Sequence, residues 1–303
     1  MRHLLLPFAL LSALACAYTA VPSTALADQA KPSAPVAMPA DPAQFHIFLL
    51  MGQSNMAGYG GIAAGDPYLP GDKDPVPGVL VLDGQGTTDN AKPVEPIAWR
   101  IGAHPLHLRQ STAQFGLGMD FAKTYLKSHP GVTVGLIPCA WGGNPIDWLK
   151  KGSPIFTNAM ARMHFAQKQG VIHGVLWHQG ESDTVTPALV DAYEGKLRAL
   201  MADVRKEAGD PHLPFVIGNL AEFYGVNGDH GGRIVSLNKV RGTLYKVGTQ
   251  DPDAAFVPST GLQSADGNQV HFNRASLVIF GQRYAEALTA LQKKQAEAKR
   301  DEK

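Results

Sequence analysis

Polar segments with reactive side chains follow three apolar runs of the sequence, and a fourth lies near the C-terminus: residues 52–56, 140–144, 178–183 and 266–272. Together they supply a hydroxyl group, glycines, side-chain amides, carboxylates and a histidine. Acyl transfer needs this inventory, because a serine nucleophile requires a base and the developing oxyanion requires fixed N–H donors. The sequence therefore predicts a site for nucleophilic catalysis.

Ser54 and His271 are the candidate nucleophile and general base. Ser54 stands in the segment Gly-Gln-Ser-Asn-Met, and His271 stands in Val-His-Phe. The step from a strand to a helix at Ser54 also favours a helix N-cap, because a serine hydroxyl can accept a hydrogen bond from the first turn. The two roles are compatible, so both stay open.

The elements that must position these residues follow from the apolar pattern. The predicted strands are residues 45–51, 132–138, 172–178 and 214–220. The predicted helices are residues 113–128, 154–169, 187–208, 236–246 and 275–291. Strands that alternate with helices indicate an α/β domain with a parallel sheet covered on both faces. Ligands bind beyond the carboxyl ends of such strands, so the polar segments are expected at one edge.

The stretch 58–101 departs from this alternation, because it is rich in Gly, Pro and Asp and has few apolar runs. It is too long for an ordinary connection. We expect a partly ordered loop region beside the site.

Four sequence blocks in this order resemble the SGNH-hydrolase superfamily: Gly-Gln-Ser-Asn-Met, Gly142-Gly143, His178-Gln179-Gly180-Glu181 and Val-His-Phe. Within it they look like carbohydrate esterase family six, the sialate O-acetylesterase and acetylxylan esterase group. The resemblance spans about residues 45–291. It implies a three-layer α/β/α sandwich of flavodoxin-like type with a central parallel sheet.

The resemblance also implies roles for individual residues. Ser54 would be the nucleophile and His271 the base. The oxyanion hole would combine the backbone N–H of Ser54, the backbone N–H of Gly142 or Gly143, and the side-chain amide of Gln179. The plain alternatives are a tight turn for the glycine pair and a hydrogen-bonded loop amide for Gln179.

The acid that supports the histidine is where this sequence departs from the family pattern. Asn268 stands three residues before His271, where many relatives have Asp, and Asp266 stands five residues before it. An amide cannot stabilise an imidazolium with charge. The resemblance offers Glu181 as another acid, so Glu181 ranks first and Asp266 second. Each also has a structural alternative, an ion-paired acid for Glu181 and a turn for Asp266.

Trp141, Asn144 and Arg100 are the candidates for substrate binding. An aromatic face suits the apolar side of a sugar ring, and a guanidinium can bind a carboxylate through two hydrogen bonds. Packing beneath a loop is an equal alternative for Trp141, and pairing with a local acid is an equal alternative for Arg100.

The formal net charge is +1, from 27 Lys and Arg against 26 Asp and Glu. This balance removes the electrostatic basis for nucleic acid as the principal partner. The 11 histidines include no short His-His spacing on one predicted helix and no His-Cys cluster of the kind typical of zinc sites. His104 and His107, the nearest pair, are expected at the surface. We therefore expect neither a metal nor an organic cofactor.

Residues 1–27 have the layout of a cleaved signal peptide, with Arg2 and His3, an apolar run, and Ala25-Leu26-Ala27 before the cleavage point. Cleavage after Ala27 predicts a secreted or periplasmic protein. The apolar run is too short to span a bilayer and no later segment is long and apolar enough, so no integral membrane segment is expected after signal removal. An uncleaved N-terminal anchor is the alternative. The sequence around Cys16 matches a lipoprotein site poorly but leaves lipidation open.

The chain is thus divided into a signal peptide, a linker, an SGNH-type esterase domain and a charged tail: residues 1–27, 28–43, 44–292 and 293–303. The function expected is that of an exported serine esterase that removes O-acetyl groups from carbohydrates. Two alternatives stay open, a catalytically inactive glycan-binding module and an esterase for non-sugar short-chain acyl esters.

Overall fold

The computed structural model describes residues 36–59, 68–88, 92–110, 114–226, 232–265 and 269–301. The predicted signal peptide and most of the predicted linker lie outside the described residues, as do Cys16 and Ala27. Their export and lipidation stay predictions.

The described residues form one sheet with the strand order β3-β2-β4-β1-β5-β6-β7. Its strands are β1 Phe45–Gly52, β2 Val76–Leu82, β3 Trp99–Gly102, β4 Thr133–Pro138, β5 Val171–His178, β6 Phe215–Gly218 and β7 Ala254–Val257. Neighbouring strands are parallel, except that β3 runs antiparallel to β2 at one edge. The predicted α/β class with a central parallel sheet is confirmed.

The central strands are buried on both faces, as continuous apolar runs require. In β1, Phe45, Phe48 and Leu50 are fully buried, and in β5 so is Trp177. Each such side chain contributes about 1.5–3 kcal/mol through burial. These strands therefore give a rigid frame whose carboxyl ends fix where the polar segments begin.

The stretch 58–101 is more ordered than its composition suggests, because β2 and β3 lie within it. In β2 only residues 79–82 are buried, while Pro77 and Gly78 are exposed. Proline and glycine are depleted in strands, so they hide the strand signal. The expectation of a loop region throughout this stretch is wrong. Strand β7 was also missed, because it is only four residues long.

The helices are α1 Ser54–Ala57, α2 Gly118–Ser128, α3 Pro154–Gln167, α4 Pro187–Ala208, α5 Ile234–Gln250 and α6 Arg274–Asp301. Local chemistry fixes the start of α4, where the Thr186 hydroxyl accepts a hydrogen bond from the Leu189 N–H at 3.3 Å. Pro187 at the first helical position and Gly209 in the left-handed region after the last turn complete the signals.

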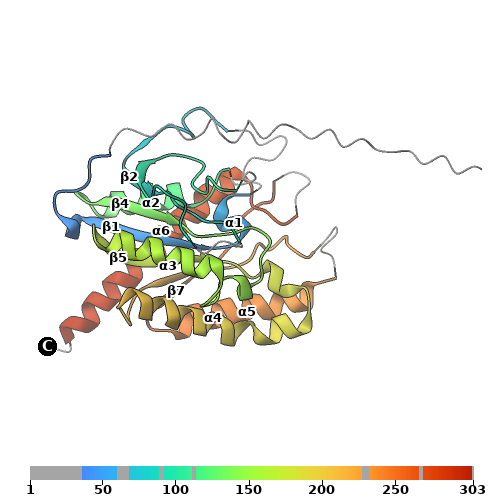
Figure 1. Cartoon of the computed structure of the whole chain (residues 1–303). Helices are drawn as coiled ribbons and strands as arrows, with labels where there is room; N and C mark the ends of the chain where they lie inside the picture. The colour runs from blue at the N-terminus through green and yellow to red at the C-terminus, as the bar shows by residue number, and fades with distance from the viewer. Residues whose placement is uncertain are drawn as a thin grey trace, which may run out of the picture. The chain divides into compact units, whose positions relative to one another are not determined.

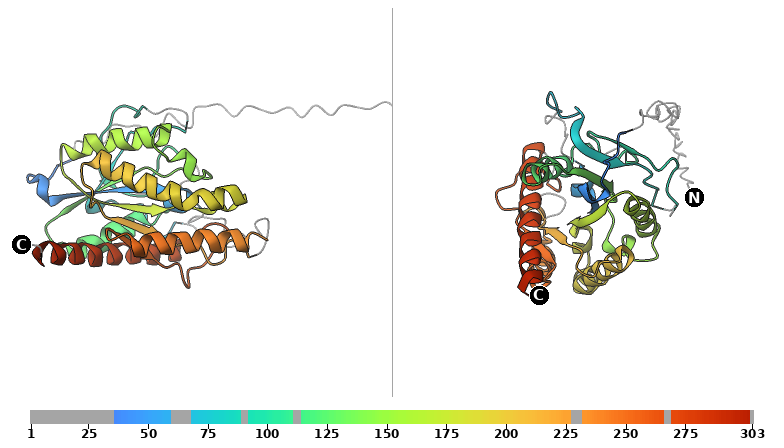
Figure 2. Two further views of the ribbon diagram at one scale, coloured as in Figure 1. Left: turned by 90° about the horizontal axis from the view of Figure 1, so that it is seen from below. Right: turned by 90° about the vertical axis from the view of Figure 1, so that its left-hand side faces the viewer.

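Helices cover both faces of the sheet, which gives the predicted three layers (Figures 1 and 2). Helices α2 and α6 pack against each other on one face, and α3 and α4 pack together on the other. Helix α5 packs on β7 and against α4. In Figure 1, α1 lies beyond the carboxyl end of β1, at the edge where ligands are expected.

Helix α6 continues to Asp301 and so includes most of the predicted charged tail. Gln295 anchors this part, because its amide donates to Asp253 Oδ1 at 2.6 Å and to the His212 carbonyl at 3.0 Å. Within the described ranges, none of the helices combines the length and apolar character that crossing a bilayer demands.

Candidate active site

A pocket of about 640 Å³ lies beyond the carboxyl ends of β1, β4 and β5. Ser54 and His271 both line it, together with Gly142, Gly143 and Glu181. The rest of its wall includes Gln53, Tyr59, Ser182, Val185, Tyr224 and Arg233. The structure therefore brings the two reactive side chains from opposite ends of the domain sequence into one cavity.

The turn after β1 places Ser54 at the wall of this pocket. Gly52 has a φ of 139°, and a Cβ atom there would collide with the backbone oxygen of His178. The Gln53 N–H then donates to that oxygen at 2.9 Å. Gln53 is the N-cap of α1 and Ser54 is its first residue, so the N-cap role considered for Ser54 is wrong. The serine is 4% exposed.

Asn55 connects the helix that carries Ser54 to the segment that carries His271. Its Oδ1 accepts the Phe272 N–H at 3.1 Å, and its Nδ2 donates to the Val270 carbonyl at 3.2 Å. These two partners flank His271 on both sides. Asn55 is fully buried, so these bonds are shielded from water. The Gln-Ser-Asn motif contains this residue, but nothing in the motif indicates its role.

Glu181 belongs to the same network, although its partners differ from the predicted one. Its Oε1 accepts from Asn55 Nδ2 at 2.7 Å and lies 3.5 Å from His178 Nε2. Burial alone would raise the pKa of the Glu181 carboxyl, but the His178 imidazole and the Asn55 amide bring it below its ordinary value. Glu181 and His271 make no ion pair among the described residues, because Asn55 and His178 hold this carboxylate.

His271 is half-buried, and its ring lies 6.0 Å from that of Tyr59, measured between centroids. Its backbone carbonyl accepts the Ala265 N–H at 3.3 Å. The second candidate acid, Asp266, lies outside the described residues, as does Asn268. The choice of acid therefore stays a prediction.

The two glycines after β4 play different parts. The Gly142 N–H donates to Gln110 Oε1 at 3.1 Å, and a Cβ atom on Gly142 would meet the ring of Tyr59. Gly143 has a φ of 74°, a left-handed conformation that favours glycine. Because Gln110 already takes up the Gly142 N–H, Gly143 is the better placed of the two to supply a free donor to the pocket.

Gln179 lies behind the pocket and is fully buried. Its amide donates to Asp183 Oδ2 and, at 3.3 Å, to the Asn144 carbonyl. Asp183 Oδ2 also accepts the Ile146 N–H at 2.9 Å. Gln179 thus holds the loop after β4 in place, and it is not among the described residues that line the cavity. Its predicted donation to an oxyanion is not seen, because Asp183 and Asn144 take its N–H groups.

The predicted substrate-binding residues are engaged within the protein. Asn144 Nδ2 donates to the Gly142 carbonyl at 3.1 Å, and the half-buried Trp141 packs against the core. Arg100 donates from Nε to Asp83 at 3.0 Å and from its terminal nitrogens to three backbone carbonyls. The local-acid alternative is therefore the correct one for Arg100.

His104 and His107 are buried, so their expected surface position is wrong. His107 Nε2 accepts the Ala140 N–H at 3.2 Å. Burial lowers the pKa of both histidines to about 3, which keeps them neutral. In the part of the chain that the structure describes, no group of three or more His, Cys, Asp or Glu side chains is arranged to hold a metal ion.

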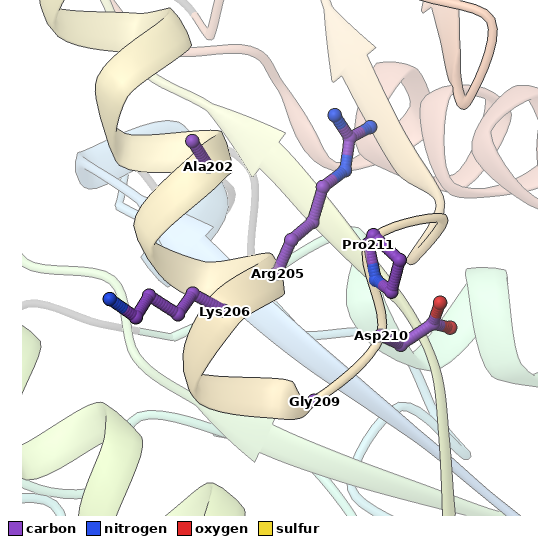
Figure 3. Close-up of a pocket in the computed structure, with 6 residues that line it drawn as sticks. All are labelled: Ala202, Arg205, Lys206, Gly209, Asp210 and Pro211. Carbon is purple, nitrogen blue, oxygen red and sulfur yellow. The ribbon is translucent and has the colours of Figure 1, made fainter.

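A second hollow of about 490 Å³ lies at the end of α4 and in the loop that follows (Figure 3). Its described wall contributes no hydroxyl, thiol or imidazole: Ala202, Arg205, Lys206, Gly209, Asp210 and Pro211. Arg205 is bonded to both carboxylate oxygens of Asp251, at 2.8 and 3.0 Å. The groups needed for acyl transfer are therefore those of the Ser54 pocket.

Comparison with known sequences agrees with this geometry. The family model described as carbohydrate esterase, sialic acid-specific acetylesterase, matches residues 44–290. A probable carbohydrate esterase of Arabidopsis thaliana is 32% identical over 185 residues. That alignment covers 56% of this chain and 66% of the relative, slightly under two thirds of its length.

Solved structures share the fold. A structure of the Arabidopsis thaliana protein has a TM-score of 0.68 at 27% identity and covers 81% of this chain and 98% of its own. The structure of NanS has a TM-score of 0.63 at 16% identity, with 83% and 98% covered. A carbohydrate acetylesterase from Xanthomonas citri has a TM-score of 0.56 at 19% identity, with 80% and 55% covered.

Proposed function

Because the chain belongs to the carbohydrate esterase family of sialic acid-specific acetylesterases, we propose that it hydrolyses carboxylic esters and removes O-acetyl groups from carbohydrates. The observation that carries this proposal is the shared pocket of Ser54 and His271, which lies beside the glycine turn after β4. A hydroxyl, an imidazole and backbone donors around one cavity are the parts that ester hydrolysis through an acyl-enzyme requires.

Acylation begins when Ser54 Oγ attacks the acetyl carbonyl carbon while His271 takes the serine proton. The carbonyl oxygen becomes an oxyanion, which the N–H groups of Ser54 and Gly143 stabilise. The Ser54 N–H suits this task because the first N–H groups of a helix have no partner within the helix. The intermediate collapses, the C–O bond to the sugar breaks, and His271 returns the proton to the sugar hydroxyl.

Deacylation repeats these steps with water. His271 removes a proton from a water molecule, which attacks the acetyl carbonyl on Ser54. The bond to Ser54 Oγ breaks, the serine recovers its proton from His271, and acetate leaves. Asn55 keeps the two partners in register throughout, since it belongs to α1 and bonds the backbone on both sides of His271.

We also propose that the protein acts after export, because residues 1–27 have the composition of a signal peptide. A carbohydrate substrate outside the cytoplasm suits this location. Mass spectrometry of the protein recovered from its host should show a mature chain that begins at Asp28, and a chain that begins at Met1 would contradict the proposal.

Acetate release tests the activity. The wild-type protein and Ser54→Ala are incubated with O-acetylated sialic acid, acetylated xylan and the non-sugar ester p-nitrophenyl acetate. We expect acetate from at least one acetylated sugar with the wild type and a loss of more than about 1,000-fold with Ser54→Ala. Ser182→Ala is the matched control, because Ser182 lines the same pocket outside the proposed mechanism.

Each other outcome identifies an alternative. Sugar binding without acetate release would identify a glycan-binding module. Acetate release confined to p-nitrophenyl acetate would identify an esterase for non-sugar short-chain esters. Equal losses in both serine variants would contradict Ser54 as the nucleophile.

A further inference from the structure

Arg233 is a part of the pocket that the proposed reaction leaves unused. It stands at the N-cap position of α5 and lines the same cavity as Ser54 and His271. Among the described residues of that wall, it is the one with a permanent positive charge. No sequence motif marks it, since it lies far along the chain from every block of the family resemblance.

Four other arginines of this protein form ion pairs, and Arg162, Arg241 and Arg283 donate to backbone carbonyls. Arg233 has neither kind of partner among the described residues. Arg100 pairs with Asp83 at 3.0 Å, and Arg205 pairs with Asp251 at 2.8 Å. Arg274 pairs with Asp72. Arg233 is also half-buried, but within the described ranges no carboxylate lies within ion-pair distance of it. The described part of the pocket wall thus holds a partly desolvated guanidinium that no described carboxylate compensates.

The chemistry of this group favours one kind of ligand. A guanidinium presents its donors in a planar fork that matches the two oxygens of a carboxylate. The positive end of the α5 dipole lies beside Arg233 and adds potential of the same sign. A carboxylate that enters this part of the pocket therefore gains charge-assisted hydrogen bonds, whereas a neutral sugar leaves the guanidinium unpaired.

The remaining charge in the wall restricts how such a ligand can lie. Glu181 contributes a buried carboxylate that repels another negative group. An acidic substrate must therefore hold its own carboxylate at the Arg233 end and present its acetyl ester to Ser54. Val185 and Leu189 supply apolar surface in the same wall, against which the apolar face of a sugar can pack.

We infer that Arg233 binds the carboxylate of the substrate and so selects acetylated acidic sugars over neutral ones. The inference rests on the proposed function, because it assumes that the acetyl group lies at Ser54 while the carboxylate lies at Arg233. It makes Arg233 a specificity-determining residue whose effect is on substrate binding.

A binding experiment tests the contact without any need for turnover. The probes are N-acetylneuraminic acid and its carboxyl methyl ester, titrated by calorimetry into Ser54→Ala so that neither is consumed. We expect the acid to bind about 10- to 100-fold more tightly than the ester, as one charge-assisted contact allows. Adding Arg233→Gln should remove this preference. Adding Arg198→Gln, which breaks an exposed pair with Glu194, should leave it intact.

Kinetics of the otherwise wild-type protein give the second readout. Arg233→Gln should raise KM for O-acetylated sialic acid and lower the kcat/KM ratio of that substrate over acetylated xylo-oligosaccharide by about 10- to 100-fold. Arg233→Lys should recover part of the ratio, because it restores the charge without the fork.

The results separate this inference from the proposed function. Equal affinity for the acid and its methyl ester, or no binding of either, would overturn the role of Arg233. So would a preference that survives Arg233→Gln. Acetate release without a preference for acidic sugars would leave the esterase proposal standing, and a preference for the acid without acetate release would leave the binding inference standing.

Discussion

The amino ends of the parallel strands form one edge of the sheet and their carboxyl ends form the opposite edge. Histidines at the two edges have different surroundings. At the amino edge, the rings of His46 and His173 stack with centroids 3.7 Å apart, and Tyr125 stacks on His129 at 3.8 Å. At the carboxyl edge, His271 lines a pocket of about 640 Å³ beside Ser54. His46 and His129 thus pack against other rings at the amino edge, whereas His271 borders a cavity at the carboxyl edge.

The surroundings decide which of these roles a histidine has. Burial, together with the neighbouring His46 and His129, lowers the pKa of His173 to about 3, so the ring is neutral near neutral pH. That environment suits packing and opposes proton transfer near neutral pH. At the carboxyl edge, the loops after β1, β4 and β5 leave space for a reactant. A histidine in this fold can therefore take part in a reaction only where the loops leave a cavity beside it.

The largest effect should come from exchanging one histidine at each edge. His271→Gln removes the proposed base, so kcat/KM for p-nitrophenyl acetate should fall by more than about 1,000-fold. His173→Gln removes a stacked ring, so it should lower the midpoint of thermal unfolding and leave kcat unchanged. Comparable activity losses in the two variants would break the distinction between the edges.

Asn55→Ala tests whether the position of His271 depends on a buried clamp, by which we mean the two hydrogen bonds from Asn55 to the backbone of Val270 and Phe272. The change leaves Glu181 and the Phe272 N–H without their partner, so the free energy of unfolding should fall by about 1–3 kcal/mol. A displaced His271 should also reduce kcat by about 100-fold. Asn158→Ala is the matched control, since Asn158 is buried and bonded to Gly84 and Arg162 away from the pocket. A variant Asn55→Ala that loses stability but keeps kcat would contradict the clamp.

The two candidate acids should differ in effect. Glu181→Gln removes the charge that holds Asn55 and His178, and it should reduce kcat by about tenfold, which equals a loss of about 1.4 kcal/mol. Asp266→Asn should have a smaller effect. Parallel measurement of kcat for both variants gives the order, and a larger loss with Asp266→Asn would assign the supporting acid to that residue.

The smallest expected effect is on the pH dependence of stability, through His173 at the amino edge. The pKa of His173 is about 3 in the folded protein against 6.5 ordinarily, so the unfolded state binds more protons between these values. The contribution of His173 to stability is complete above pH 6.5 and is lost as the pH falls toward about 3. Urea unfolding of His173→Phe should show a flatter fall across this range than the wild type. Identical pH profiles would contradict the assigned role of the ring.

Much of the frame could be predicted from sequence, because long apolar runs specify buried strands. The runs that contain β1, β4, β5 and β6 and the helical spacing of α4 correspond closely to the structure. Strands β2, β3 and β7 were missed because they are partly exposed or four residues long. Such short segments become strands through pairing with neighbours, which periodicity cannot show.

Sequence reasoning located the candidate site through the residue types that acyl transfer needs, a serine and a histidine. Ser54 and His271 do lie at one pocket, as their chemistry suggested. Gln179 was expected to donate to the oxyanion, Glu181 to support His271 and Arg100 to bind substrate. In the structure Asp183, Asn55 and Asp83 are hydrogen-bonded to these three side chains. Asn55 lies far from Glu181 in the sequence, while Asp183 and Asp83 lie nearer to their partners, but no motif marks any of these three contacts. The folded arrangement is needed to reveal them. The sequence likewise does not indicate that Arg233 lines the pocket or that it has no acidic partner among the described residues.

The central claim is that Ser54 is the nucleophile of the carboxyl-edge pocket. Incubation with a fluorophosphonate followed by peptide mass spectrometry tests it directly, because the probe forms a covalent bond with an activated serine. We predict one adduct per chain, located on the peptide that contains Ser54 and absent after His271→Gln. An adduct on Ser182, or no adduct in a protein that still releases acetate, would contradict the account.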